Sequence, residues 1–257
     1  AQPRAMPAPP RLAFEGVTKA YGATRAVDDV TREIPGGKFV ALVGQSGSGK
    51  STLLKTINRL IVPDAGRVTI DGADMCEGSD ALLRRRIGYV FQNVGLFPHL
   101  TVAENVAMPQ RIGGARVDVG ARLDQVELPR DLADRTPAQL SGGQRQRVGI
   151  ARALAGEAKL LLMDEPFGAL DPVTRDALGR RVRGLHDELG LTTILVTHDM
   201  AEALLLADRV LVMAAGRIVA DATPAELLAG QSGPVADALV AVPREQARAL
   251  AAIEGAR

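Results

Sequence analysis

A glycine- and serine-rich segment at residues 44–52 constrains this chain more than any other part of its sequence. It reads GQSGSGKST and fits the pattern G-x-x-x-x-G-K-[S/T]. A short, continuous apolar run at 39–43 leads into it, and a helical pattern at 51–60 follows. The alternative interpretation is a Gly/Ser-rich turn before an ordinary helix, and the combination of strand, loop, lysine and serine disfavours it. The segment therefore predicts a buried strand, a phosphate-binding loop and a helix start, in that order.

The residue types in this segment suit a nucleoside triphosphate. Glycines let the backbone wrap tightly, so that successive N–H groups surround an anion. The helix start adds unpaired N–H donors and the positive end of a dipole. Lys50 supplies a point charge for the outer phosphates, and the Ser51 hydroxyl suits a magnesium ligand. The expected nucleotide contacts are Ser46, Gly47, Ser48, Gly49, Lys50, Ser51 and Thr52.

Composition sets limits on the function. The chain has 257 residues, a formal net charge of +1, no Trp and an aromatic content of 3%. Balanced charge and scarce aromatic rings argue against a nucleic-acid partner. Cys76 is the single cysteine, so an intrachain disulfide is excluded and a reducing compartment is expected. No apolar stretch approaches the roughly 20 residues that span a bilayer, so we expect a soluble, cytoplasmic protein.

The chain divides into a leader, one main domain and a tail. Residues 1–11 are rich in proline and lack the apolar core of a signal peptide, so we expect a disordered leader. Residues 12–230 form one expected domain, and 231–257 a short helical tail. Strand patterns disappear between residues 101 and 155, which predicts an inserted helical subdomain at about 98–155.

Apolar periodicity predicts the individual elements of an α/β fold. The segments 159–163 and 192–196 are apolar runs separated by a helical pattern at 174–189, which indicates βαβ organisation and a parallel sheet. Further strands are expected at 12–19, 27–34, 39–43, 67–70, 87–91, 210–213 and 217–220. Further helices are expected at 51–60, 102–108, 117–126, 142–154, 225–229 and 244–253, the helix at 225–229 opening on a Thr223 capping box.

Two acids follow the apolar run at 159–163. Ligands in open α/β sheets collect at the carboxyl ends of the strands, where the phosphate loop must also lie. Asp164 is well placed to hold Mg²⁺ opposite Ser51, and Glu165 to accept a proton from water attacking the γ-phosphate. The alternative is a charge pair at a strand exit or the start of a helix cap.

A second Ser/Gly-rich helix start, Leu140-Ser141-Gly142-Gly143-Gln144, resembles a further anion site. An ordinary serine cap is the alternative. LSGGQ placed before LLLMDE resembles the signature of ATP-binding cassette (ABC) ATPases, and the resemblance extends from about residue 12 to 230. It implies a P-loop ATPase core with a mainly parallel sheet, an antiparallel β subdomain and an inserted α-helical signature subdomain. It also implies that two copies pair head to tail, each ATP lying between one copy's phosphate loop and the other's Ser141, Gly142, Gly143 and Gln144.

The resemblance assigns further roles residue by residue. Tyr21 matches the aromatic that stacks on adenine, and Gln92 the glutamine that touches Mg²⁺ and the attacking water. Asp171 matches the loop that communicates across the dimer, and His198 the histidine that contacts the γ-phosphate. Each has a plain structural alternative: a turn tyrosine, a lone glutamine, an acid before a helix-starting proline, and a strand-end histidine. His99 and His186 lack such a context and are expected on the surface or in packing.

Three classes of ABC ATPase remain: a transporter subunit, a soluble ATPase acting on DNA or ribosomes, and a regulatory module without turnover. The interval from Gln92 to Leu140 has no sustained heptads, which disfavours an ATPase acting on DNA. The chain has one cassette, whereas members acting on ribosomes generally join two. Both Glu165 and His198 are present, which disfavours a module without turnover, so the transporter is favoured. We expect separate transmembrane permease subunits, docked near 92–106 through Val94, Leu96, Phe97 and Leu100, unless these side chains only pack within the helical subdomain. A P-loop GTPase is disfavoured because no N-K-x-D motif occurs, and a P-loop kinase would not need LSGGQ.

Finer motifs at 57–61, 95–101 and 166–172 resemble the quaternary-amine and osmoprotectant branch of bacterial importers. This implies uptake of glycine betaine, choline or a related solute, with a periplasmic or extracellular substrate-binding protein and a peripheral position on the cytoplasmic face of the inner membrane. Importers of amino acids, sulfonates or nitrate are the alternatives. Many relatives carry C-terminal regulatory CBS domains, whereas too few residues follow 225–229 for one, so we expect no regulation of that kind.

Overall fold

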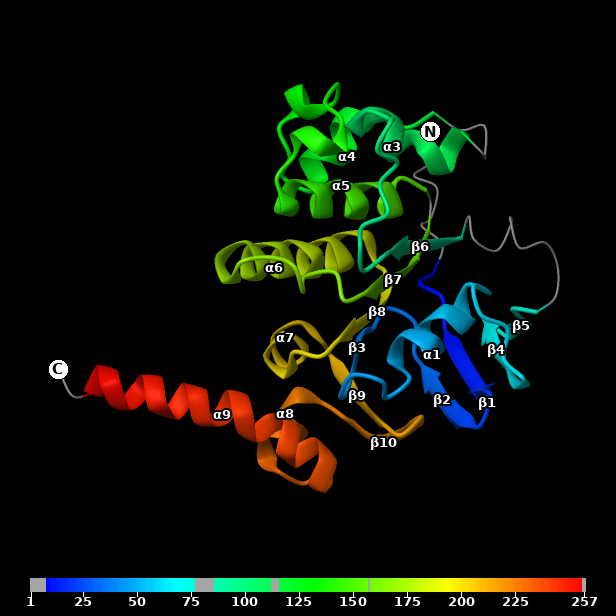
Figure 1. Cartoon of the computed structure of the whole chain (residues 1–257), viewed down its shortest axis with the longest axis vertical. Coiled ribbons are helices and arrows are strands. Elements are labelled where there is room, and N and C mark those ends of the chain that lie inside the picture. Colours follow the sequence, from blue (N-terminus) through cyan, green and yellow to red (C-terminus); the bar gives the residue numbers. More distant parts are fainter. Residues whose placement is uncertain (1–7, 77–85, 112–115, 157, 256–257) are drawn as a thin grey trace.

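A computed structural model describes residues 8–76, 86–111, 116–156 and 158–255, and their strands form two sheets (Figure 1). The larger sheet has six strands in the order β10-β9-β3-β8-β7-β6, and the smaller has four in the order β2-β1-β4-β5. The strands are β1 (Leu12–Tyr21), β2 (Thr24–Ile34), β3 (Phe39–Val43), β4 (Ala65–Ile70), β5 (Ala73–Asp74), β6 (Ile87–Val90), β7 (Leu160–Asp164), β8 (Thr192–Thr197), β9 (Arg209–Ala214) and β10 (Arg217–Ala222).

The six-stranded sheet is parallel except at one edge. Strand β3 pairs in parallel with β8 and β9, β7 pairs in parallel with β8 and β6, and β10 runs antiparallel to β9. Alternate residues of β3 enter different apolar clusters: Phe39, Ala41 and Val43 one, Val40 and Leu42 the other. Burial on both faces explains why these strands read as continuous apolar runs.

Helices cover both faces of this sheet. In Figure 1, α3, α4 and α5 form a group at one end of the molecule, away from the four-stranded sheet that lies beside α1. The expected α/β architecture is confirmed: a mainly parallel core, a separate antiparallel sheet and an inserted helical part. The helices are α1 (Lys50–Ile57), α3 (Val102–Arg111), α4 (Val119–Gln125), α5 (Gly142–Leu154), α6 (Pro172–Leu189), α7 (Met200–Leu206), α8 (Pro224–Ala229) and α9 (Pro234–Gly255), with 3₁₀ turns η1 (Arg130–Leu132) and η2 (Pro137–Gln139).

Several expected helix boundaries are wrong; α3, for example, ends at Arg111 rather than residue 108. Helix α1 ends at Ile57 rather than residue 60, because Arg59 adopts a φ of 56°, outside the right-handed helical region. Helix α9 begins at Pro234 rather than residue 244 and continues through Pro243. Ala236 and Val240 are buried in the core, and this packing holds the segment before Pro243 helical. The Thr223 capping box is present, with Pro224 as the first helical residue.

The sequence prediction missed β5, α7 and the two 3₁₀ turns, all of which are short. Three consecutive arginines at 84–86 precede β6. Of these, only Arg86 belongs to the described residues, where it is exposed in a turn. No helix in the described ranges is long and apolar enough to cross a bilayer.

Candidate functional site

The glycine loop between β3 and α1 is pressed against neighbouring backbone. Gly44 has a φ of 155° and Gly49 a φ of 103°. A Cβ atom added to Gly44 would lie 2.1 Å from the Met213 carbonyl oxygen, and one added to Gly49 would lie 1.9 Å from that of Ala26. Only glycine fits this cradle, because both distances are far below van der Waals contact and the backbone conformation at both residues disfavours a side chain.

Lys50 is buried beneath this loop. It is 5% exposed, and its Nζ donates to the carbonyl oxygens of Gly44 and Gln45 at 2.9 Å each. Burial lowers the pKa of Lys50, against the opposing charges of Glu165 and Asp164. The nearby Ser48 hydroxyl is also buried and has no hydrogen-bond partner among the described residues. A buried cation bonded to carbonyl oxygens, beside a hydroxyl that lacks a partner in this part of the structure, fits a loop that receives an anion.

Ser51 and Asp164 meet as the sequence predicted. The Ser51 hydroxyl donates to Asp164 Oδ1 at 2.6 Å, and the carboxylate is almost fully buried. The Tyr89 hydroxyl lies 3.4 Å and Lys55 Nζ 3.5 Å from Asp164 Oδ2. Burial, with the charge of Asp164, raises the pKa of Tyr89 above its usual range. A hydroxyl and a carboxylate are hard oxygen donors of the kind Mg²⁺ prefers, so these two residues fit that ion.

Sequence reasoning missed Lys55 and Tyr89 as neighbours of Asp164. Lys55 had a readable signal, because it lies four residues after Ser51 on the same helix and therefore on the same face. Tyr89 had a weaker one, a hydroxyl in the otherwise apolar strand β6, which pairs with β7 so that Tyr89 faces Leu162 in register. Both side chains lie beside the expected magnesium ligand.

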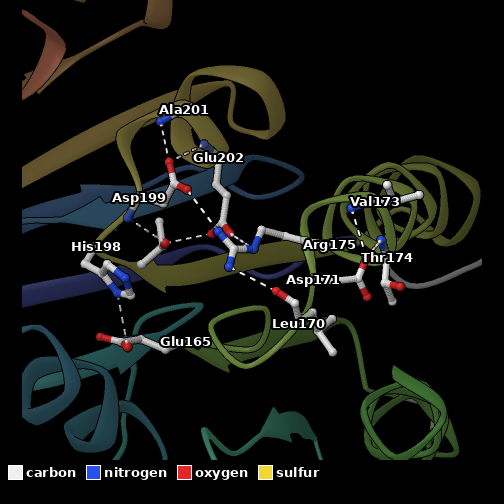
Figure 2. A network of polar contacts seen from close by, with 11 residues as sticks. Glu165, Leu170, Asp171, Val173, Thr174, Arg175, His198, Asp199, Ala201 and Glu202 are labelled. Carbon is white, nitrogen blue, oxygen red and sulfur yellow. Dashed lines mark hydrogen bonds and ion pairs between the residues drawn. The ribbon is translucent and has the colours of Figure 1, made fainter. Parts of the chain in front are cut away.

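Glu165 is the point at which three expected catalytic side chains meet. Its Oε2 lies 3.3 Å from His198 Nδ1 (Figure 2). The same oxygen lies 3.4 Å from Gln92 Nε2. Gln92 follows β6, Glu165 follows β7 and His198 follows β8, which are neighbouring parallel strands. The carboxyl ends of parallel strands meet at one sheet edge, and that edge carries the phosphate loop.

The backbone at Glu165 is strained. Its φ is 46°, in a region that a glutamate seldom adopts, and its N–H donates to the Val196 carbonyl at 2.9 Å. This bond to the neighbouring strand holds the conformation and turns the chain sharply at the strand end. Strain of this kind is concentrated at functional sites.

The loop that follows Gln92 is also strained, and a buried arginine holds it. Val94 and Gly95 have φ values of 55° and 59°. Arg152 on α5 is buried and donates to the carbonyl oxygens of both residues at 2.6 Å. Burial lowers the pKa of Arg152. A Cβ atom at Gly149 would lie 2.6 Å from Val94 Cγ1, so α5 and this loop are in close contact.

The remaining expected site residues lie apart from this cluster. Asp171 caps α6, accepting from the N–H groups of Val173 at 3.1 Å and Thr174 at 3.0 Å. Hydrogen bonding with Thr174 lowers the pKa of Asp171. Ser141 and Gln144 form a reciprocal capping box at the start of α5, with Gly142 and Gly143 in its first turn. No interaction among the described residues joins these groups to the phosphate loop.

The aromatic and histidine residues complete the expected set. Tyr21 ends β1 with 53% of its surface exposed, and Lys19 Nζ lies 5.7 Å from its ring centre. His186 is buried, with Nδ1 2.9 Å from Thr193 Oγ1 and its ring against Phe39. His99 is exposed beside Phe97. Tyr21 therefore has a free ring face available for stacking, whereas His186 has a packing role.

A family model described as "ABC transporter" matches residues 27–168. The chain belongs to this family. The matched stretch contains the phosphate loop, the Ser141–Gln144 capping box, Asp164 and Glu165. In the resemblance drawn from the sequence, this capping box corresponds to the ABC signature sequence.

Three curated relatives show where in the ABC family the chain lies. It is 49% identical over 223 residues to the carnitine transport ATP-binding protein OpuCA of Listeria monocytogenes, covering 84% of this chain and 56% of that protein. It is 47% identical over 222 residues to the glycine betaine uptake system ATP-binding protein YehX of Escherichia coli, and the alignment covers 84% of this chain and 72% of that protein. It is 48% identical over 225 residues to the sulfate/thiosulfate import ATP-binding protein CysA 1 of Chromobacterium violaceum, and the alignment covers 84% of this chain and 62% of that protein. The chain thus spans a little over half the length of the first of these relatives.

Solved ABC cassettes have the same fold. The dimeric structure of the ATP-binding cassette MJ0796 in a post-hydrolysis state, bound to ADP and Pi, superposes with a TM-score of 0.76 at 35% identity. The alignment covers 83% of this chain and 98% of that one. CbiO1 from Clostridium perfringens, part of the transporter complex cbiONQ, also superposes with a TM-score of 0.76, at 31% identity.

Proposed function

We propose that this chain is the ATP-hydrolysing subunit of a bacterial ABC importer. The observation that carries the proposal is the meeting of Gln92 and His198 on Glu165, at the sheet edge that holds the phosphate loop. A phosphate-binding loop alone would support binding. A carboxylate held by two polar side chains beside that loop supports hydrolysis, because it can orient and deprotonate water.

The phosphate groups would be held by the loop N–H groups of 46–52 and by Lys50, which exchanges its two carbonyl partners for phosphate oxygens. Ser51 and Asp164 would hold Mg²⁺, with Gln92 as a further oxygen ligand. When bound, this ion neutralises charge on the phosphate oxygens. Tyr21 would stack on adenine through its exposed ring.

Glu165 would act on the water that attacks the γ-phosphate. A proton of that water passes to the Glu165 carboxylate while the water oxygen bonds to phosphorus and the bond to ADP breaks. His198 and Gln92 would fix the orientation of the carboxylate, since both contact its Oε2. The strained backbone at Glu165 keeps the side chain at the strand end, where the nucleotide would lie.

A second copy would complete the site. Ser141, Gly142, Gly143 and Gln144 have no contact with the phosphate loop of their own chain among the described residues, yet they form a helix start suited to an anion. Asp171 lies likewise outside the Glu165 cluster. The solved cassette MJ0796, at 35% identity, is a dimer bound to ADP and Pi. We infer that two copies bind ATP between them, each supplying the signature sequence to the other.

The transported solute would be a quaternary amine such as glycine betaine, choline or carnitine. Relatives with 47–49% identity are named for carnitine and glycine betaine transport. A sulfate or thiosulfate importer is the competing assignment, since CysA 1 is 48% identical over a similar stretch. Titrating glycine betaine and sulfate against the extracytoplasmic binding protein of the purified transporter distinguishes the two.

The chain would work on the cytoplasmic face of the membrane, with permease subunits and a substrate-binding protein. Phe91 and Phe97 flank the loop after Gln92, and each has 42% of its surface exposed. Val102 and Val106 are buried, so only the first part of the expected 92–106 dock is available to a partner. An exposed apolar pair beside a residue that contacts Glu165 suits the docking of a permease helix.

Substitution of Glu165 tests the proposed function. Glu165→Gln keeps the size of the side chain but removes its proton-accepting charge, so turnover falls about 10²- to 10⁴-fold while ATP binding persists. Glu188→Gln on α6, an exposed residue paired with Arg181, is the matched control and keeps wild-type turnover. Phosphate release and binding of a fluorescent ATP analogue measure the two quantities. Wild-type turnover in Glu165→Gln would remove Glu165 from this role.

A further inference from the structure

Two short turns carry the residues that form the Glu165–His198 contact. The turn after β7 is closed by bonds from the Gly168 N–H to the Glu165 carbonyl at 3.4 Å and from the Leu170 N–H to the Phe167 carbonyl at 3.1 Å. The turn after β8 is closed by a bond from the Asp199 N–H to the Thr197 hydroxyl at 3.0 Å. The position of each turn therefore determines whether the Glu165 carboxylate and the His198 ring meet.

Arg175, on α6, connects these two turns (Figure 2). One guanidinium nitrogen donates to the Leu170 carbonyl at 3.1 Å. A second donates to Asp199 Oδ2 at 3.4 Å, and Nε lies 3.7 Å from Glu202 Oε1. The planar guanidinium presents several donors in fixed directions, so a single side chain holds groups from both turns.

The acidic partners of Arg175 fix both neighbours of His198. Asp199 caps α7, accepting from the Ala201 N–H at 2.8 Å. Glu202 is mostly buried and accepts from the Thr197 hydroxyl at 2.7 Å. Burial raises the pKa of Glu202, while the charge of Arg175 opposes that shift. Removing the cation would leave a buried carboxylate next to Thr197 without its positive partner.

We propose that Arg175 is a positioning residue for hydrolysis, which holds the Glu165 turn and the His198 turn in the relative position that lets their side chains meet. This inference rests on the proposed ATPase function. Among the described residues, Arg175 makes no hydrogen bond or ion pair with Glu165 or His198, so it acts through the backbone and the acids around them. None joins it to Lys50 or Ser51 either, so we expect nucleotide binding to persist without it.

The same side chain connects His198 to the segment that would face a second copy. The Arg175 N–H donates to the Asp171 carbonyl at 2.9 Å, and Leu170 directly precedes Asp171. A partner that displaces Asp171 therefore moves a group bonded to Arg175, and through it the turn of His198. Arg175 thus couples the arrival of the second copy to the geometry of the hydrolytic cluster.

The test compares turnover and binding in five variants, one of them a control. Arg175→Met keeps an unbranched apolar side chain but removes the charge and the N–H donors. Arg175→Lys restores the charge without the planar, multiple-donor geometry of the guanidinium. His198→Ala is made alone and together with Arg175→Met. Arg180→Met is the control, because Arg180 lies on the same helix, is exposed and pairs only with Asp176 among the described residues. Each protein is assayed for ATP hydrolysis and for affinity to a fluorescent ATP analogue.

We expect Arg175→Met to lose about 10- to 100-fold in kcat, the cost of a displaced catalytic group, with an unchanged nucleotide affinity. Arg175→Lys recovers part of the loss, and Arg180→Met matches wild type. In the His198→Ala background, Arg175→Met causes little further loss, because both changes disrupt one contact. Losses that multiply in the double variant, or a parallel loss of affinity, would overturn the proposal.

A second readout separates this inference from the proposed function. In ¹⁵N-histidine-labelled protein, the imidazole signals of His198 report its surroundings without any turnover. They shift in Arg175→Met and stay in place in Arg180→Met if Arg175 positions His198. An unchanged His198 spectrum in Arg175→Met would refute the positioning role. Absence of hydrolysis in the wild-type protein would refute the proposed function and leave the spectral test intact.

Discussion

At the scale of single residues, backbone geometry explains the choice of amino acid. Gly44 and Gly49 lie where an added Cβ atom would overlap a carbonyl oxygen of β9 or of β2. Glu165 adopts a left-handed φ without being glycine, at the strand end where the proposed function places its carboxylate. The sequence singles out all three positions, because the phosphate-loop pattern and the pair of acids after an apolar strand are local signals.

Replacement of Gly49 tests how closely the phosphate loop packs against β2. In Gly49→Ala the new methyl group would lie 1.9 Å from the Ala26 carbonyl oxygen, so the loop must move away from β2. We expect a loss of about 1–3 kcal/mol in the free energy of unfolding, as for overpacked sites, together with weaker nucleotide binding. Gly184→Ala is the control: its nearest atoms are flexible side-chain ends at 3.6 and 3.7 Å, and alanine favours the helix. Urea unfolding followed by circular dichroism should find Gly49→Ala less stable than both wild type and this control, and equal stability would contradict the account.

At the scale of elements, the sequence predicted the helices and strands whose bounds are marked by a local sequence pattern. The bounds of β3 and α5 are those expected, because a buried parallel strand is continuously apolar and a capping box marks a helix start. The expected start of α9 was wrong, because its first turns are held helical by tertiary burial of Ala236 and Val240. The side-chain bonds of Arg152 and Arg175 could not be predicted, since they join elements that are distant in sequence.

Arg152 provides the element-scale test, because it attaches α5 to the strained loop at Val94 and Gly95. In Arg152→Met both bonds are lost and two carbonyl oxygens lose a charged donor, so we expect about 2–3 kcal/mol lower stability. Turnover also falls, since Gln92 precedes this loop by two residues and contacts Glu165. Arg122→Met, which among the described residues removes a part-buried bond to Gln125 within α4, is the control for both measurements. Unfolding and hydrolysis at wild-type values in Arg152→Met would show that the loop does not need this attachment.

At the scale of the whole molecule, the described residues include two glycine-rich helix starts that do not meet. The glycine loop at 44–49 opens α1 and the Ser141 capping box opens α5, and α5 belongs to the helical group at the other end of the molecule from the four-stranded sheet (Figure 1). Helix α9 extends away from the body, with Leu250 and Ile253 largely exposed (Figure 1). The central claim is that a second copy brings the two helix starts together around ATP.

The most direct measurement is analytical ultracentrifugation of Glu165→Gln with and without Mg·ATP. Because this variant binds ATP but does not hydrolyse it, the account predicts a dimer with Mg·ATP and a smaller dimer fraction without it. Adding Ser141→Arg, which places a bulky cation at the signature helix start, should abolish the ATP-dependent dimer while each protomer still binds nucleotide. A protein that remains monomeric with saturating Mg·ATP, or a dimer unaffected by Ser141→Arg, would contradict the shared site.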